Sequence, residues 1–274
     1  MPRFSANLSM LFHEHPFLDR FEAAAQAGFS AVEYISPYEH APEEIAARLR
    51  RHRLTQALFN MPAGDWAAGE RGIAALPGRQ EEFRESVETA LAYAAALGCT
   101  RVNCLAGIVP AAGREAAHGV FVDNLRSAAR RFAEEGVRLL IEPINDRIDI
   151  PGFFLTTSAQ ALAIIDEVGS DNLFLQYDIY HMQVMEGDLA RTIERNFHRI
   201  AHVQVADNPG RHEPGSGEIG FPFLFAHLDR LGYRGWVGAE YRPVKGTAEG
   251  LGWFSPWRET AASHTSPPPP HSTR

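Results

Sequence analysis

The 274-residue chain has only two cysteines, no excess of basic residues and no long apolar run. Cys99 and Cys104 do not form a CxxC pair and cannot crosslink a chain of this length, so we expect a reducing, cytoplasmic setting. The formal net charge is −8, and lysine and arginine form no stripe. The acidic balance argues against nucleic acid and anionic membrane surfaces as partners.

Targeting, membrane-spanning and phosphate-binding segments are also missing. Residues 1–10 lack the basic and apolar segments of a signal peptide. No apolar stretch approaches the roughly 20 residues that cross a bilayer. The chain has no glycine-rich phosphate-binding motif, so we expect no nucleotide cofactor and an unphosphorylated small-molecule substrate. A homo-oligomer remains possible.

Short apolar segments alternate with helical patterns eight times along residues 1–254. This alternation predicts a single-domain α/β protein, a parallel (β/α)₈ TIM barrel with its active site at the C-terminal ends of the strands. The alternative is a doubly wound open sheet, which usually places its ligand at a switch point. Residues 255–274 contain a run of prolines and are predicted to be a disordered tail.

Four predicted strands end in an acidic or amide side chain. The clearest is the apolar run 138–141, which leads directly into Glu142 and Pro143. The other three end at Asp178, Gln204 and Glu240. A single acid at a strand end is more often bonded to a neighbouring loop. Four of them at the rim of one barrel favour a functional site.

These four residues form a set of hard, oxygen-rich ligands. Such a set suits Mg²⁺ or Mn²⁺ better than a metal that prefers thiolates. Carboxylates that lie close together repel one another unless a cation or protons compensate their charge. We therefore predict that Glu142, Asp178, Gln204 and Glu240 hold one divalent metal ion.

Five further residues are candidate substrate contacts. His181 follows Asp178 by one helical turn, and His202 shares a strand face with Gln204. His202 could equally be a core histidine bonded to a neighbour. Arg211, in a polar loop, could bind a carboxylate through two parallel hydrogen bonds or simply be solvated. Asn7 and Asn60, at predicted strand ends, complete the set.

Residues 61–79 interrupt the alternation of strands and helices. They contain four glycines, two prolines, a tryptophan and several charged residues. A structureless stretch of this length in a compact domain is usually functional or disordered. The aromatic and charged content favours an active-site flap, and a surface insertion is the alternative.

Several runs of the sequence resemble the hydroxypyruvate isomerase family, within the xylose-isomerase-like (sugar isomerase/AP endonuclease) TIM barrels. The resemblance covers residues 2 to about 257 and rests on residues 3–11, 60–72, 142–145, 176–183 and 206–209. It implies that Glu142 and Glu240 are proton donors and acceptors. It also implies a reaction that interconverts hydroxypyruvate and tartronate semialdehyde through an enediolate, with a metal stabilising the negative oxygen. The strand-seven metal position, often histidine in the wider superfamily, is Gln204 here.

Other functions remain open at this point. A 2-oxo-tetronate or ketose isomerase or epimerase of the same superfamily would use the same two glutamates. An AP-endonuclease-like hydrolase is less favoured, because it needs a histidine-rich zinc cluster and a basic surface for DNA. A non-catalytic sugar-binding barrel is the least favoured alternative, since acids at four strand ends are costly to keep without a ligand.

Overall fold

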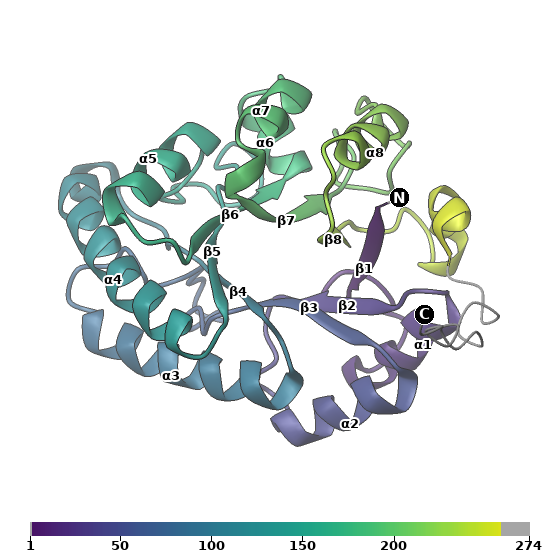
Figure 1. Cartoon of the computed structure of the whole chain (residues 1–274), viewed down its shortest axis with the longest axis horizontal. Helices are drawn as coiled ribbons and strands as arrows, with labels where there is room; N and C mark the ends of the chain where they lie inside the picture. Colours follow the sequence, from purple (N-terminus) through teal and green to yellow (C-terminus); the bar gives the residue numbers. More distant parts are fainter. Residues whose placement is uncertain (1, 259–274) are drawn as a thin grey trace, which may run out of the picture.

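The computed structural model describes residues 2–258. Its strands are β1 (Arg3–Asn7), β2 (Ala31–Tyr34), β3 (Thr55–Asn60), β4 (Arg101–Cys104), β5 (Arg138–Ile141), β6 (Leu173–Asp178), β7 (Ile200–Val205) and β8 (Trp236–Ala239). They form one closed barrel in chain order (Figure 1). All neighbours are parallel, and β1 pairs with β8, with Phe4 opposite Val237. The predicted single-domain (β/α)₈ barrel is confirmed, and this closing pair excludes the open sheet.

Helices surround the barrel on its outer side (Figure 1). The α-helices are α1 (Arg20–Gln26), α2 (Pro42–His52), α3 (Gln80–Leu97), α4 (Arg114–Glu134), α5 (Ser158–Val168), α6 (Ile179–Met185), α7 (Leu189–Arg195) and α8 (Phe221–Arg230). Four 3₁₀ segments are η1 (Phe17–Asp19), η2 (Ala111–Gly113), η3 (Phe197–Arg199) and η4 (Ala248–Trp257). Within residues 2–258, none of the helices combines the length and apolarity required of a membrane span.

Side chains of the strands alternate between two apolar regions. In β5, Leu139 and Ile141 belong to the main core, which also contains the buried faces of the helices. Leu140 instead forms a small cluster with Leu58 of β3 and Ala201 of β7. Successive side chains of a strand point to opposite faces, and layers built from alternate strands fill such barrels. The apolar run of β5 is therefore explained by burial on both faces.

The 3₁₀ segment η4 continues past the predicted boundary at residue 254. Ser255 to Trp257 belong to η4. The Trp257 ring packs edge-on against Phe4 and Phe225, at centroid distances of 5.4 Å and 5.3 Å. This aromatic packing explains why the 3₁₀ segment continues past residue 254. The rest of the predicted tail, residues 259–274, lies outside the described residues.

The loop of residues 61–79 is attached to the segment after β4. Gly72 forms an isolated antiparallel bridge with Ala106, and its N–H donates to Ala63 at 2.9 Å. The φ angle of Gly72 is +109°, and a Cβ there would lie 2.2 Å from the Leu105 carbonyl oxygen. Only glycine fits this close approach. The base of the loop is therefore fixed against the barrel rim.

Candidate active site

A cavity of about 530 Å³ lies at the C-terminal ends of the strands. Glu142 directly follows β5, Glu240 directly follows β8, and both line the cavity. Asn60, His181 and Arg211 line it as well. The cavity therefore gathers both predicted proton-transfer residues and three of the five predicted substrate contacts.

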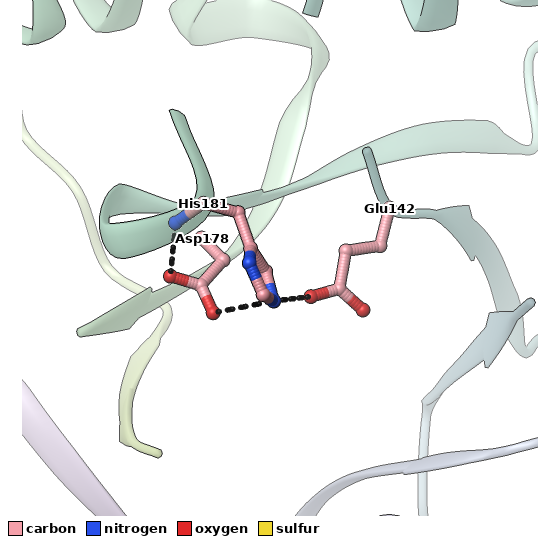
Figure 2. A group of neighbouring side chains, drawn as sticks. All are labelled: Glu142, Asp178 and His181. Carbon is pink, nitrogen blue, oxygen red and sulfur yellow. Dashed lines mark hydrogen bonds and ion pairs between the residues drawn. The ribbon is translucent and has the colours of Figure 1, made fainter. Parts of the chain in front are cut away.

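Asp178 ends β6 and starts α6. Its Oδ1 accepts hydrogen bonds from the backbone N–H groups of Tyr180 (2.8 Å) and His181 (3.3 Å), which caps the helix. Its Oδ2 is buried and makes no hydrogen bond within the described residues. The first turn of α6 brings His181 back toward the strand ends, as its spacing predicts. Figure 2 shows the imidazole between two carboxylates, with Nε2 3.7 Å from Asp178 Oδ2 and 4.0 Å from Glu142 Oε1.

Asn145 determines which nitrogen of His181 carries the proton. The Asn145 side-chain oxygen accepts from the backbone N–H groups of Ile148 and Asp149, both at 3.0 Å. Its amide nitrogen therefore faces His181 and donates to Nδ1 at 2.7 Å. A neutral imidazole that accepts at Nδ1 carries its proton at Nε2. His181 thus presents a hydrogen-bond donor to the cavity.

Two asparagines orient Glu142. Asn103 of β4 donates to Glu142 Oε2 at 2.9 Å and to the Asn60 side-chain oxygen at 3.2 Å. Sequence reasoning missed Asn103, although a polar residue inside the strand Arg101–Cys104 is the signal that could have identified it. Asn60 reaches the cavity, as predicted, and contacts Glu142 indirectly through Asn103.

Arg211 lies between acidic side chains. Its Nη1 donates to Asp149 at 2.9 Å and its Nη2 to Glu240 at 3.0 Å, while Asp178 Oδ2 lies 3.8 Å from Nη2. The arginine is 7% exposed. Two of the three guanidinium nitrogens therefore already pair with acids, while Nε makes no hydrogen bond within the described residues, and binding of a substrate carboxylate by Arg211 stays a prediction. Asp149 was missed because it lies in a loop without a strand pattern.

A second polar network lies deeper in the barrel, around Glu33 of β2. Its carboxylate accepts from Asn7 at 3.3 Å and from Gln204 at 2.9 Å, and lies 2.8 Å from His202 Nε2. Asn7 and His202 do not line the cavity. The substrate contacts predicted for them are therefore not supported, and His202 fits the alternative of a core histidine. Glu33 was missed because it lies inside the short strand Ala31–Tyr34 rather than at a strand end.

Gln204 connects this network to its neighbouring strand. Its amide nitrogen donates to Glu33, and its oxygen accepts from Gln176 Nε2 at 2.6 Å. Both polar atoms of the side chain are therefore engaged inside the barrel. Binding a metal through the Gln204 oxygen would require it to share that oxygen or release Gln176, so this ligand stays a prediction.

The side chains that could hold a metal ion lie close together. Glu142, Asp178 and His181 each offer one ligand atom, and these atoms lie within 4.8 Å of one another. The buried, unpartnered Oδ2 of Asp178 beside a second carboxylate suits a divalent cation. His181 could become a metal ligand through Nε2 only if that nitrogen gave up the proton that it carries when Nδ1 accepts from Asn145. Glu240 is not part of this compact group.

Burial changes the proton affinities of these groups. It raises the pKa of Glu142 well above its ordinary value, and the charges of Glu240 and Asp178 add to this. Burial also raises the pKa of Glu240 to about 8 and that of Asp178 to about 6, although Arg211 opposes both changes. Burial, followed by the charge of Arg211, lowers the pKa of His181. The site is therefore suited to a neutral imidazole and to carboxyl groups that exchange protons near neutral pH.

The raised pKa of Glu240 gives the metal-free protein a characteristic dependence of stability on pH. Folded Glu240 keeps a proton that the unfolded chain loses above about pH 4.5, so its contribution to stability falls as the pH rises from there to about 8. We expect Glu240→Gln to be as stable as wild type at pH 5 and more stable at pH 9. The difference should be a few kcal/mol, because one pH unit between two pKa values corresponds to about 1.4 kcal/mol.

Urea unfolding of both proteins in the presence of a chelator, from pH 5 to 9, measures this difference. Taking the difference removes the contributions of titrating groups that Glu240 does not influence, and leaves that of Glu240 together with its effect on Glu142. If the two stability curves run parallel, Glu240 does not hold its proton in the way that its burial implies.

Comparisons with known proteins, by sequence and by structure, identify relatives of this barrel. Residues 21–257 match the family model for xylose isomerase-like TIM barrels. The hydroxypyruvate isomerase of Escherichia coli is 54% identical and covers 94% of this chain and 100% of its own. The 2-oxo-tetronate isomerase of Cupriavidus necator is 53% identical, covering 94% and 99%. The crystal structure of an AP endonuclease, family 2, from Brucella melitensis superposes with a TM-score of 0.93 at 49% identity, covering 94% of this chain and 100% of that chain. The chain belongs to the xylose isomerase-like TIM barrel family.

Proposed function

We propose that the protein is an isomerase that interconverts hydroxypyruvate and tartronate semialdehyde. One observation carries this proposal: Glu142 and Glu240, from strands three steps apart, line one cavity with buried carboxyl groups. Two such groups can remove a proton at one carbon and deliver a proton at the next. The similarity to the Escherichia coli hydroxypyruvate isomerase supports the same substrate.

The surroundings of the two glutamates suggest different starting roles. Arg211 opposes the rise in the pKa of Glu240, and we assign the ionised form of Glu240, which is populated as the pH approaches 8, as the base that takes a proton from the hydroxymethyl carbon. The resulting enediolate then receives a proton on the former carbonyl carbon from Glu142, whose pKa is raised by burial. The hydroxyl proton moves to the other oxygen, which completes the shift of the carbonyl group.

Two other features would stabilise the enediolate. The Nε2 proton of His181 is available to donate to the oxygen on which negative charge develops. A divalent cation, Mg²⁺ or Mn²⁺, held by Glu142 and Asp178 with Gln204 and Glu240 as further predicted ligands, would supply positive charge next to that oxygen.

A 2-oxo-tetronate is the second candidate substrate. The cavity adjoins a larger one of about 970 Å³, and both are lined by Ser9, His13, Ile35 and Trp66. This space would accept a longer hydroxy-keto acid. The similarity to the 2-oxo-tetronate isomerase of Cupriavidus necator supports the same alternative.

The substrate can be tested by incubating the metal-loaded protein with hydroxypyruvate, a 2-oxo-tetronate and a six-carbon ketose, and following the products by NMR. We expect kcat/KM for hydroxypyruvate to exceed that for the ketose by at least about tenfold, a difference of about 1.4 kcal/mol. Faster turnover of the tetronate would select the second candidate, and faster turnover of the ketose would overturn both.

The other predictions about partners rest on the sequence. A cytoplasmic location, a homo-oligomer and the lack of nucleic-acid partners remain predictions. The acidic net charge still argues against a DNA hydrolase. The compact group of potential metal ligands also contains a single histidine, which is less than a histidine-rich zinc cluster provides.

A further inference from the structure

A hydroxy-keto acid brings a negative charge into a site that is already acidic. Glu142, Asp149 and Glu240 line the cavity, and Asp178 lies directly behind them. Arg211 is held by Asp149 and Glu240 and is close to Asp178. Its charge is therefore shared among acids of the protein. A cationic side chain that is not already paired with an acid would strengthen binding of the substrate carboxylate.

Arg71, in the loop of residues 61–79, lines the same cavity. Its guanidinium carbon lies 3.9 Å from the centre of the Trp66 ring. Its Nη1 donates to the backbone oxygens of Trp66 (3.1 Å) and Glu70 (2.6 Å). These contacts hold the guanidinium in place before any ligand binds, which lowers the entropy cost of recognition.

The charge of Arg71 is not neutralised by a neighbouring acid. Within residues 2–258 it makes no ion pair, and its Nε and Nη2 make no hydrogen bond. The adjacent Glu70 is occupied elsewhere, because it accepts from the Asp65 N–H at 2.6 Å and pairs with Arg79 at 2.7 Å. The loop therefore presents one edge of a positioned guanidinium that can bind a carboxylate through two parallel hydrogen bonds.

We propose that Arg71 binds the carboxylate of the substrate and that Trp66 positions it. This inference rests on the proposed function, because it assigns the acid group of the proposed substrate to a residue. Arg242 also lines the cavity, but its side chain is exposed and makes no hydrogen bond within the described residues. An arginine without such support loses more side-chain entropy on binding, so Arg71 is the better candidate.

The test compares Arg71→Gln with the matched control Arg242→Gln. Binding of D-glycerate, which carries a carboxylate, and of glycerol, which does not, is measured by calorimetry with the metal-loaded proteins. We expect Arg71→Gln to weaken glycerate binding by roughly 10- to 100-fold, because a charge-assisted pair of hydrogen bonds is lost. Glycerol binding should not change, and Arg242→Gln should bind both as wild type does. Trp66→Ala should weaken glycerate binding by a smaller factor.

Each result decides the proposal. Unchanged glycerate binding by Arg71→Gln, an equal loss for glycerol, or no measurable glycerate binding by wild type at millimolar concentration would each overturn it. Arg71→Lys adds a check on folding, since it should recover part of the affinity through its charge. The binding assay requires no turnover. Wild type that binds glycerate through Arg71 but does not isomerise hydroxypyruvate would reject the proposed substrate alone.

Discussion

Replacing either Glu142 or Glu240 by glutamine is expected to lower kcat for hydroxypyruvate by about 10²- to 10⁴-fold, the usual contribution of general acid–base catalysis. Glutamine has nearly the same shape but cannot take up or release a proton. It also keeps an oxygen that can accept from Asn103 at position 142 or from Arg211 at position 240. The loss should therefore reflect proton transfer and weaker metal binding rather than a change of fold.

The matched control is Glu167→Gln, which makes the same substitution on the outside of the barrel, where Glu167 pairs with His118. Its kcat should equal that of wild type. Running the reaction in D₂O tests the scheme independently, because carboxyl groups that exchange with water place solvent deuterium in the product. Complete retention of the substrate's own hydrogen would indicate a hydride shift and exclude proton transfer by the two glutamates.

Removing divalent metal is expected to lower activity by at least about 10²-fold, since a bound cation contributes several kcal/mol to stabilising negative charge in a transition state. Adding back Mg²⁺ or Mn²⁺ should restore the activity. Asp178→Asn is the most informative variant. An asparagine oxygen can still cap α6, while the negative charge of the carboxylate, and with it the Oδ2 atom that could bind the metal, is lost.

Calorimetric titration of Asp178→Asn with Mg²⁺ and Mn²⁺ should show at least about tenfold weaker binding than wild type, because the cation loses a charged hard ligand. The thermal midpoint of the metal-free variant should stay close to that of wild type, or rise, since a buried carboxylate is removed. Full activity in thoroughly chelated wild-type protein would contradict a metal role and leave the acids to share protons.

The sequence predicted the barrel and its rim because both depend on local patterns. A strand covered on both faces must be apolar, so the carboxyl group of Glu142 at its end was conspicuous. The same reasoning located Asp178 and Glu240, and helical spacing located His181. These features require only the period of a strand or helix and the rule that parallel strands end at one rim.

Features that depend on contacts between distant residues could not be predicted. Glu33 and Asn103 are polar residues inside short strands, and their partners come from other strands. The pairing of Arg211 with Asp149 joins two loops separated by 62 positions in the chain. The continuation of η4 past residue 254 depends on Trp257, which packs against Phe4 at the other end of the sequence.

The contact between Gly72 and the Leu105 carbonyl has a consequence for how the loop tolerates substitution. It fixes the base of the loop to the rim, while residues 65–71, including Trp66 and Arg71, extend from that base over the cavity. We expect substitutions in this short stretch to leave the barrel and the strand-end acids undisturbed. Substrate preference can then be altered at Trp66 and Arg71 while the barrel and its catalytic rim stay the same.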